Sequence, residues 1–189
     1  IYEAGPWDEM GVWLFGPEVL GLPVRKLNRK SVSFFHTGYH VLRGIDEGTS
    51  CAFRCGTILD RFSQIDMLHL DVWWRGQNVL VDAGSYLYNG SAHWHNHFMR
   101  TGSHNAVRID SRDQMLHYRR FKCLYRTEAK LLRFEDSPEW AICEGEHYGY
   151  QRYPGKCVHR RAVLFVKDDA FVVVDRIMGH GVHNAGLQW

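Results

Sequence analysis

The sequence predicts an all-β protein built as an antiparallel β-sandwich. Short stretches that alternate polar and apolar residues recur along most of the chain, and glycine-rich turns separate them at regular spacing. No heptad pattern or internal repeat interrupts this rhythm. The length of 189 residues and an apolar content of 45% allow one domain with a sizeable core.

The first 22 residues are the exception, because their signals are helical. Asp8 precedes an apolar-rich run that ends at Gly16 and Pro17, so we expect a short helix from Asp8 to Phe15. We interpret residues 1–22 as the end of a preceding helical domain.

The domain boundaries follow from this change of pattern. Residues 23–30 are basic and are interpreted as a linker, and residues 31–189 form the β-sandwich domain. The chain starts without Met or a signal sequence and stops just after an apparent strand start. We therefore expect both ends to be cuts in a longer polypeptide, with the sandwich truncated at its C-terminal side.

Residues from 31 onward supply the expected strands. Alternation and turn signals place them at residues 32–35, 39–43, 50–55, 68–74, 79–82, 106–109, 140–144, 158–166 and 170–177. Residues 121–134 hold two strands or one long bent strand. The last two strands form a hairpin, and the run Val172–Val174 is typical of a strand covered on both faces.

Charge and cysteine content exclude several classes of function. The 23 basic and 21 acidic residues give a net charge of +2. This balance does not favour a nucleic-acid partner, because binding to nucleic acid usually needs a basic patch or stripe. No apolar run reaches 18 residues, so no membrane-spanning helix is expected. The spacing of the five cysteines fits no zinc ribbon. Free buried thiols are favoured, and one disulfide is the alternative for an exported protein.

The stretch from Arg61 to Asp110 carries most of the chemistry. Asp82 ends an apolar strand, where a carboxylate is costly unless it is hydrogen-bonded, paired or bound to a metal. It either caps the following turn, binds a metal or orients a histidine. His104 opens a later strand as a structural residue, a ligand or a proton-transfer group. Together they suggest a zinc site.

A second cluster alternates imidazoles with other polar and aromatic groups. His93, His95 and His97 flank Trp94 and Asn96, and in an extended chain the three imidazoles would share one side, as a three-histidine zinc site requires. Histidines at alternate positions of one strand would need a tight bend to bind the same ion. We therefore favour a solvated or substrate-facing loop, with the indole of Trp94 stacked on a sugar ring.

Other polar residues of the stretch give weaker signals. His69 and Asp71 share one strand face, which is read as the polar outer face of the sheet. Arg75, Arg100 and Arg108 either pair with acids or hold an anionic substrate. No nucleophile elbow, phosphate-binding loop, dinucleotide fingerprint or HExxH motif is found, so these patterns alone leave the reaction unknown.

Several blocks follow one another in a fixed order from about residue 34 to the end of the chain. They are Gln64-x-Asp66-x-Leu68-His69-x-Asp71-x-Trp73-Trp74-x-Gly76, Asp82-x-Gly84-x-Tyr86-x-Tyr88-Asn89, Arg100-Thr101-x-x-His104-Asn105, Asp110-Ser111-Arg112-Asp113-Gln114-Met115, Gly145-Glu146-His147-x-Gly149-Tyr150, His159-Arg160-Arg161 and Asp175-Arg176-x-x-Gly179. In this order they resemble the heparinase II/III-like family of polysaccharide lyases. Linked blocks make this resemblance far more specific than a single motif.

The resemblance implies a two-part bacterial enzyme. Its N-terminal half is an α/α toroid, of which residues 1–22 are the end, and its C-terminal half is a supersandwich-like antiparallel β-sandwich. Such lyases cleave uronic-acid polysaccharides such as glycosaminoglycans or alginate by β-elimination: the C5 proton is removed, the carboxylate is neutralised and the 4-O bond breaks. Tyrosine and histidine usually act as acid and base at the domain interface. An acidic polysaccharide as partner and a periplasmic or secreted location follow from the same resemblance.

The resemblance also implies a zinc site, but this chain differs from the family at one of the three ligand positions of that site. Asp82 and His104 match two ligands of that site, whereas Gln64 stands where the third ligand is usually histidine. Glutamine is a poor zinc ligand. His69 is the alternative third ligand.

Roles for the other residues complete the expectation. His104 and His97 are the catalytic candidates, and His97 stands where relatives often have tyrosine. The expected substrate contacts are Trp94, His95, Arg100, Asn105 and Tyr88. The toroid carries further catalytic groups, so the isolated chain is expected to be inactive.

Two other functions compete with this one. A non-catalytic carbohydrate-binding or structural sandwich is the alternative. A metal-dependent hydrolase centred on Asp82 and His104 is disfavoured, because no clear third ligand accompanies them.

Overall fold

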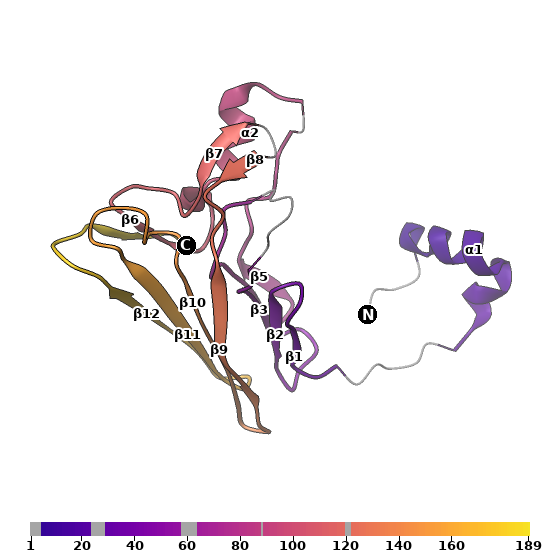
Figure 1. Cartoon of the computed structure of the whole chain (residues 1–189). Coiled ribbons are helices and arrows are strands. Elements are labelled where there is room, and N and C mark those ends of the chain that lie inside the picture. Colours follow the sequence, from indigo (N-terminus) through magenta and orange to yellow (C-terminus); the bar gives the residue numbers. More distant parts are fainter. Residues whose placement is uncertain (1–4, 24–28, 58–63, 88, 120–121) are drawn as a thin grey trace.

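The protein is an antiparallel β-sandwich, as expected from the sequence (Figure 1). The computed structural model describes residues 5–23, 29–57, 64–87, 89–119 and 122–189. One sheet has five strands in sequence order: β1 (Val32–Phe34), β2 (Tyr39–Arg43), β3 (Ser50–Arg54), β4 (Leu70–Trp74) and β5 (Gln77–Leu80). The second has the order β12 (Ala170–Met178), β11 (Val158–Val166), β10 (Trp140–His147) and β9 (Ala129–Asp136).

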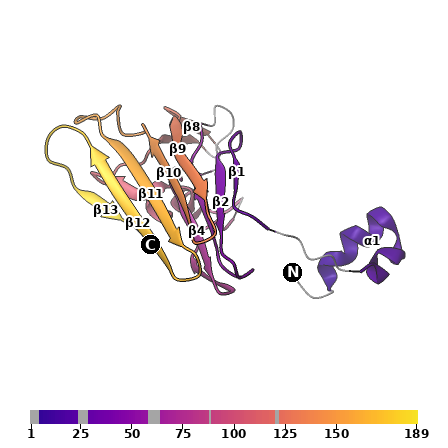
Figure 2. The same cartoon turned by 90° about the horizontal axis from the view of Figure 1, so that it is seen from below.

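Two small sheets complete the architecture. One pairs β13 (Ala185–Leu187) with β6 (Val107–Ile109), and the other pairs β7 (Leu116–Arg119) with β8 (Lys122–Leu124). All paired strands are antiparallel. Figure 2 shows β12, β11, β10 and β9 side by side in this order, with β2 and β1 of the first sheet beyond β9.

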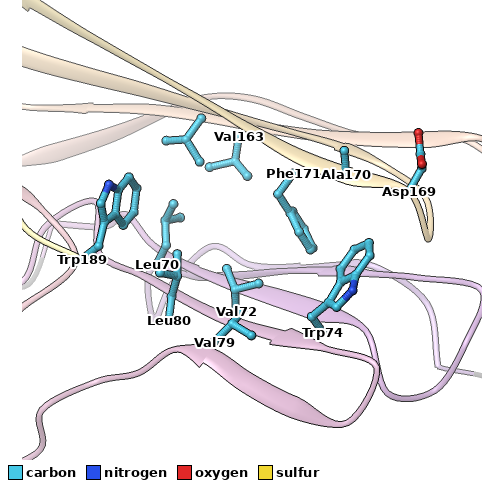
Figure 3. Close-up of a pocket in the computed structure, with 11 residues that line it drawn as sticks. Leu70, Val72, Trp74, Val79, Leu80, Val163, Asp169, Ala170, Phe171 and Trp189 are labelled. Atoms are coloured by element: carbon cyan, nitrogen blue, oxygen red, sulfur yellow. The ribbon is translucent and has the colours of Figure 1, made fainter.

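The core lies between the two large sheets, because each strand turns every second side chain inward. Its buried members are Leu42, Cys51, Phe53, Cys55, Leu68, Leu70, Val72, Ala141, Cys143, Val163 and Phe165. Toward one side the sheets leave an apolar pocket of about 460 Å³. Trp74 and Trp189 lie at its two ends, and Phe171 reaches into it from β12 (Figure 3).

The expectation that Val172–Val174 is covered on both faces is wrong. Val172 and Val174 are 47% and 57% exposed, whereas Val173 packs against the core. β12 is an edge strand, and alternation turns its outer valines away from the sandwich. A run of three apolar residues does not reveal which of its faces has a partner.

Residues 92–98 form a helix, α2 (Ala92–Phe98), and not the loop expected from the sequence. The aromatic and imidazole side chains of this segment explain the helix, because rings four residues apart contact each other. Trp94 stacks on Phe98 at 6.1 Å, and His93 lies 6.0 Å from His97. These are i, i+4 pairs, which meet only when the segment is helical.

The N-terminal segment contains the expected helix, α1 (Glu9–Phe15), between the 3₁₀ turns η1 (Pro6–Asp8) and η2 (Pro17–Gly21). Its large apolar side chains are exposed; Trp13 and Phe15 reach 79% and 75%. None of the helices in the described ranges has the length and hydropathy needed to cross a membrane. All five cysteines are buried and free, in agreement with the favoured expectation.

Candidate functional site

The structure brings His69, Asp82 and His104 together from three segments of the chain. His69 immediately precedes β4, Asp82 follows β5, and His104 follows the 3₁₀ turn η3 (Thr101–Ser103). The pairing of β4 with β5 places the first two side by side. The ligand-type atoms of the three side chains all lie within 4.8 Å of one another, which is the spacing of a metal site.

Hydrogen bonds occupy the carboxylate of Asp82. Its Oδ1 accepts the backbone N–H of Gly84 at 2.7 Å, and its Oδ2 lies 3.2 Å from Nδ1 of His104. The bond to His104 is the main reason that the pKa of Asp82 falls to about 2, although burial opposes it. Burial lowers the pKa of His69 to about 4, so this imidazole is neutral at pH 7 while Asp82 is ionised.

The position of one proton decides whether His69 can bind a metal. The backbone N–H of Asn105 donates to Nδ1 of His69 at 3.0 Å, so the neutral ring carries its proton on Nε2. That Nε2 lies 3.5 Å from Oδ2 of Asp82 and directs a proton, not a lone pair, toward the centre of the cluster. A histidine ligand to a metal must present an unprotonated nitrogen. In this tautomer the three residues do not fit a three-ligand zinc site. Asp82 is held in a clamp of hydrogen bonds to Gly84 and His104, and Nε2 of His69 lies beside it without a hydrogen-bond partner among the described residues.

Gln64 lies beside this clamp without entering it. Its side-chain nitrogen donates to the carbonyl of Gly84 at 3.2 Å and to Oγ of Ser85 at 3.3 Å. Its Oε1 and Nε2 of His104 are buried atoms without a hydrogen-bond partner in the described part of the chain. Gln64 thus holds the turn that follows Asp82.

Asn105 is buried and ties the clamp to the sheet. Its side-chain nitrogen donates to the carbonyls of Leu70 and Val81, at 2.8 and 3.2 Å. Arg161 of β11 in turn donates to the carbonyls of Leu68 and Asn105, at 2.8 and 2.6 Å. The side chain of Asn105 thus bonds to the backbone of the first sheet, and its backbone N–H bonds to His69.

Arg161 belongs to a buried polar chain that runs through the second sheet. It makes a bidentate ion pair with Asp175, at 2.7 and 2.9 Å. Asp175 also accepts from His159 at 2.6 Å, and His159 lies 3.2 Å from His147. Burial lowers the pKa of both histidines, so both are neutral. These residues stand in the blocks that carry the family resemblance, but no local pattern indicates their link to Asp82.

The exposed face of α2 lies beyond the clamp. Trp94 is 47% exposed, and the side chain of His97 is also exposed. Tyr86, 66% exposed, contacts Trp94 edge-on at 5.9 Å and Phe98 at 5.7 Å. Tyr86 was not among the expected substrate contacts, and its place in a family block was the signal that could have identified it. Together these side chains form an accessible aromatic and imidazole surface.

Three further residues were expected at the site. Arg100 is half-exposed and pairs with Asp113 at 3.6 Å. Tyr88 and the side chain of His95 lie outside the described residues. His104 is buried with its side chain against Asp82, and is therefore closed to direct contact with a polysaccharide.

Known proteins similar to this chain are lyases. The heparinase II/III-like, C-terminal family matches residues 26–189. A heparin-sulfate lyase of Bacteroides stercoris is 27% identical over 159 residues, which cover 79% of this chain and 21% of that enzyme. A heparin-sulfate lyase of Pedobacter heparinus is 25% identical over 130 residues, covering 67% of this chain and 18% of that enzyme. The chain thus spans about a fifth of the length of these relatives.

Solved structures agree on the fold. The heparan sulfate lyase HepC from Pedobacter heparinus superposes with a TM-score of 0.71 at 22% identity, covering 97% of this chain and 28% of that one. A crystal structure of heparinase III gives a TM-score of 0.65 at 25% identity, with 83% and 24% covered. With its sandwich fold and a sequence match over residues 26–189, this chain belongs to the heparinase II/III-like family and corresponds to the C-terminal domain of its polysaccharide lyases.

Proposed function

We propose that this chain is the β-sandwich part of a polysaccharide lyase that cleaves uronic-acid-containing glycans by β-elimination. The observation that carries the proposal is the match of residues 26–189 to the C-terminal domain of the heparinase II/III-like family. Both relatives described above are heparin-sulfate lyases, which supports an acidic polysaccharide as the substrate.

Residues 1–22 form the end of the helical toroid in this proposal, and residues 23–30 link it to the sandwich. The exposed apolar side chains of α1, including Trp13 and Phe15, support this assignment. Side chains of this kind are buried in most folded domains, so their exposure marks a surface that needs a partner. The remainder of the toroid would supply that partner and the opposite wall of the cleft.

The substrate contacts the exposed face of α2. The indole of Trp94 packs on a sugar ring, and the accessible imidazole of His97 exchanges a proton with the substrate. Among the described residues Arg100 pairs only with Asp113, which leaves most of its guanidinium N–H groups available for the uronate carboxylate. A cation at this carboxylate stabilises the negative charge that develops when the C5 proton leaves.

His104 and Asn105 act as positioning residues. His104 holds Asp82, Asn105 holds His69, and both are buried. The clamp fixes the segment that leads from the end of β5 toward Tyr86 and α2. In this chain hydrogen bonds and not zinc brace the segment, which is supported by the proton on Nε2 of His69.

The test is an elimination assay on the longer polypeptide that includes the toroid. Unsaturated uronate absorbs in the ultraviolet, so turnover on heparan sulfate, hyaluronan and alginate is read directly. We expect turnover by the longer polypeptide, none by the isolated chain, and a loss of kcat in His97→Gln that the exposed His36→Gln control does not show. Glycan binding without elimination in the longer polypeptide would instead support the non-catalytic carbohydrate-binding sandwich.

A further inference from the structure

The hairpin of β7 and β8 concentrates positive charge on a chain that is otherwise nearly neutral. Residues 114–127 contain Arg119, Arg120, Lys122 and Arg126 and no acidic residue, whereas the whole chain has a net charge of only +2. Arg119, Lys122 and Arg126 are exposed. Within the described ranges, none of these three cations forms an ion pair. Clustered cations repel one another, so this arrangement favours an anionic partner.

Tyrosine rings interleave with these cations. The guanidinium of Arg119 lies 5.0 Å from the centre of the Tyr118 ring, and the ammonium group of Lys122 lies 5.9 Å from it. Tyr118 and Tyr125 are 51% and 66% exposed. Cation–π contacts orient the charged groups while leaving them in solvent. The exposed rings offer flat apolar surfaces on which the C–H face of a sugar packs.

A polar groove continues this surface beyond β8. Its volume is about 560 Å³, and it is lined by Arg126, Glu128, Tyr148, Gln151 and Arg152. The guanidinium of Arg152 lies 5.8 Å from the Tyr125 ring, which joins the groove to the hairpin. The amide of Gln151 provides hydrogen-bonding groups suited to sugar hydroxyls, and the hydroxyl of Tyr148, which donates to Glu146, retains its acceptor lone pairs.

The hairpin packs beside α2. Met99, the C-cap residue of α2, shares a buried cluster with Met115 and Cys123 of the hairpin region. Asp113 pairs with Arg100, and Figure 1 shows β7 and β8 next to α2. The cationic surface and the face of Trp94 therefore lie at the same end of the molecule.

We propose that Tyr118, Arg119, Lys122 and Arg126, together with this groove, form a second binding surface for a sulfated, uronic-acid-containing polysaccharide. An unsulfated glycosaminoglycan such as hyaluronan carries a carboxylate on only every second sugar, whereas a heavily sulfated chain such as heparin adds sulfate groups to these carboxylates. Arg119 and Lys122 of the hairpin and Arg126 just after it match the denser charge, and guanidinium groups bind sulfate and carboxylate oxygens in pairs. This inference rests on the proposed function for its substrate class and adds where a longer substrate chain is held.

The experiment measures direct binding by this chain, so it does not depend on elimination activity. Fluorescence anisotropy with an end-labelled heparin dodecasaccharide gives the affinity across a range of salt concentrations. The test variant is Arg119→Gln/Lys122→Gln/Arg126→Gln. Its control is Lys30→Gln/Lys156→Gln/Arg176→Gln, which removes three exposed cations elsewhere and changes the net charge equally. Circular dichroism verifies that both variants fold.

We expect the test variant to bind at least about tenfold more weakly at low salt, and the slope of log affinity against log salt to fall by about two to three. The control should change affinity less than about twofold, because distant exposed charges are largely screened. Unlabelled hyaluronan of equal length should compete poorly. Equal losses in both variants would overturn the proposal.

Two further outcomes are informative. A single-stranded thymidine oligomer is the first. If it binds as tightly as heparin, and if the test variant no longer binds it, the surface binds polyanions in general and the polysaccharide assignment is overturned. If the longer polypeptide shows no elimination while the test variant alone loses heparin binding, the proposed lyase function fails and this surface stands.

Discussion

At the scale of single residues, Asp82 shows how side chains spaced like metal ligands can be held by hydrogen bonds. Three polar side chains converge on one point, as in a metal site. The N–H of Asn105 nevertheless fixes the tautomer of His69, whose Nε2 proton faces the carboxylate. His69 thus places a second imidazole beside Asp82.

We predict that purified wild-type protein contains no stoichiometric zinc. Asp82 and His104 are the two ligands left, and two ligands hold zinc weakly. The double variant Gln64→His/His69→Ala should gain zinc, because it restores the usual ligand and removes the competing proton. Elemental analysis after exposure to zinc and dialysis measures both. One zinc per wild-type chain that is lost in His69→Ala would contradict the clamp.

Asp175 makes stability depend on acidic pH. Burial raises its pKa, but hydrogen bonds from His159 and Arg161 outweigh this effect, and the pKa falls to about 2. The unfolded carboxyl titrates near its usual pKa of about 3.9. The stabilisation that ionised Asp175 gives the folded state is therefore complete above about pH 5 and is lost as the pH falls toward 2, and it amounts to about 2 kcal/mol.

Asp175→Asn should remove this acid dependence. We expect the free energy of unfolding, measured by urea titration, to change less between pH 4 and pH 2 in the variant than in wild type, by about 2 kcal/mol. Asp169→Asn changes an exposed carboxylate and serves as the control. An unchanged acid profile in Asp175→Asn would show that other carboxyl groups carry the effect.

At the scale of elements, β10 contains a glycine that the packing of the two sheets requires. The pairing of β10 with β9 shifts register between Glu144 and Gly145. A β-carbon on Gly145 would collide with Sγ of Cys55 and come within 3.2 Å of the Phe53 ring. Since both neighbours are buried in the core, neither can move without disturbing β3.

Gly145→Ala should therefore lower the free energy of unfolding by about 2 kcal/mol, as expected for overpacking of a core. Gly186→Ala in β13 is the matched control, because nothing lies within 4 Å of its added β-carbon. Urea unfolding at neutral pH compares the two. Equal stability of both variants would mean that the two sheets are able to separate at this point.

Helix α2 shows the limit of reading elements from a pattern. Alternating histidines predict an extended segment, yet helical pairing brings Trp94 onto Phe98 and His93 toward His97. Both periods fit seven residues, so alternation alone does not decide between them. The contact of Tyr86 with both Trp94 and Phe98 favours the helix and is not visible in the local sequence.

At the scale of the molecule, Arg161 joins the two sheets. It is fully buried in β11, pairs with Asp175 of β12, and donates to the carbonyls of Leu68 and Asn105 at the edge of the first sheet. A buried guanidinium with this many partners has no equivalent in lysine, which is a point charge without the planar fork. The candidate site therefore depends on a residue of the opposite sheet.

Arg161→Lys should lower the free energy of unfolding by about 3 kcal/mol, because it leaves a buried carboxylate and two carbonyls incompletely paired. The neighbouring Arg160→Lys should cost about 1 kcal/mol or less, since Arg160 pairs with Glu146 at the surface. Urea unfolding of both variants measures the difference. Comparable losses would show that charge alone matters at position 161.

The sequence by itself determined the fold class and most strand positions, because alternation and turn residues act locally. Its ordered residue blocks indicated the family, which the match over residues 26–189 shows. The sequence also placed Asp82, His104, His97 and Trp94 in one candidate region. Tertiary structure decided what that region is. The helical form of α2, the exposed face of β12 and the proton on His69 depend on contacts between segments far apart in the chain, such as Asn105 with His69 and Arg161 with Leu68. No local pattern encodes such contacts, since they form only when two sheets pack face to face.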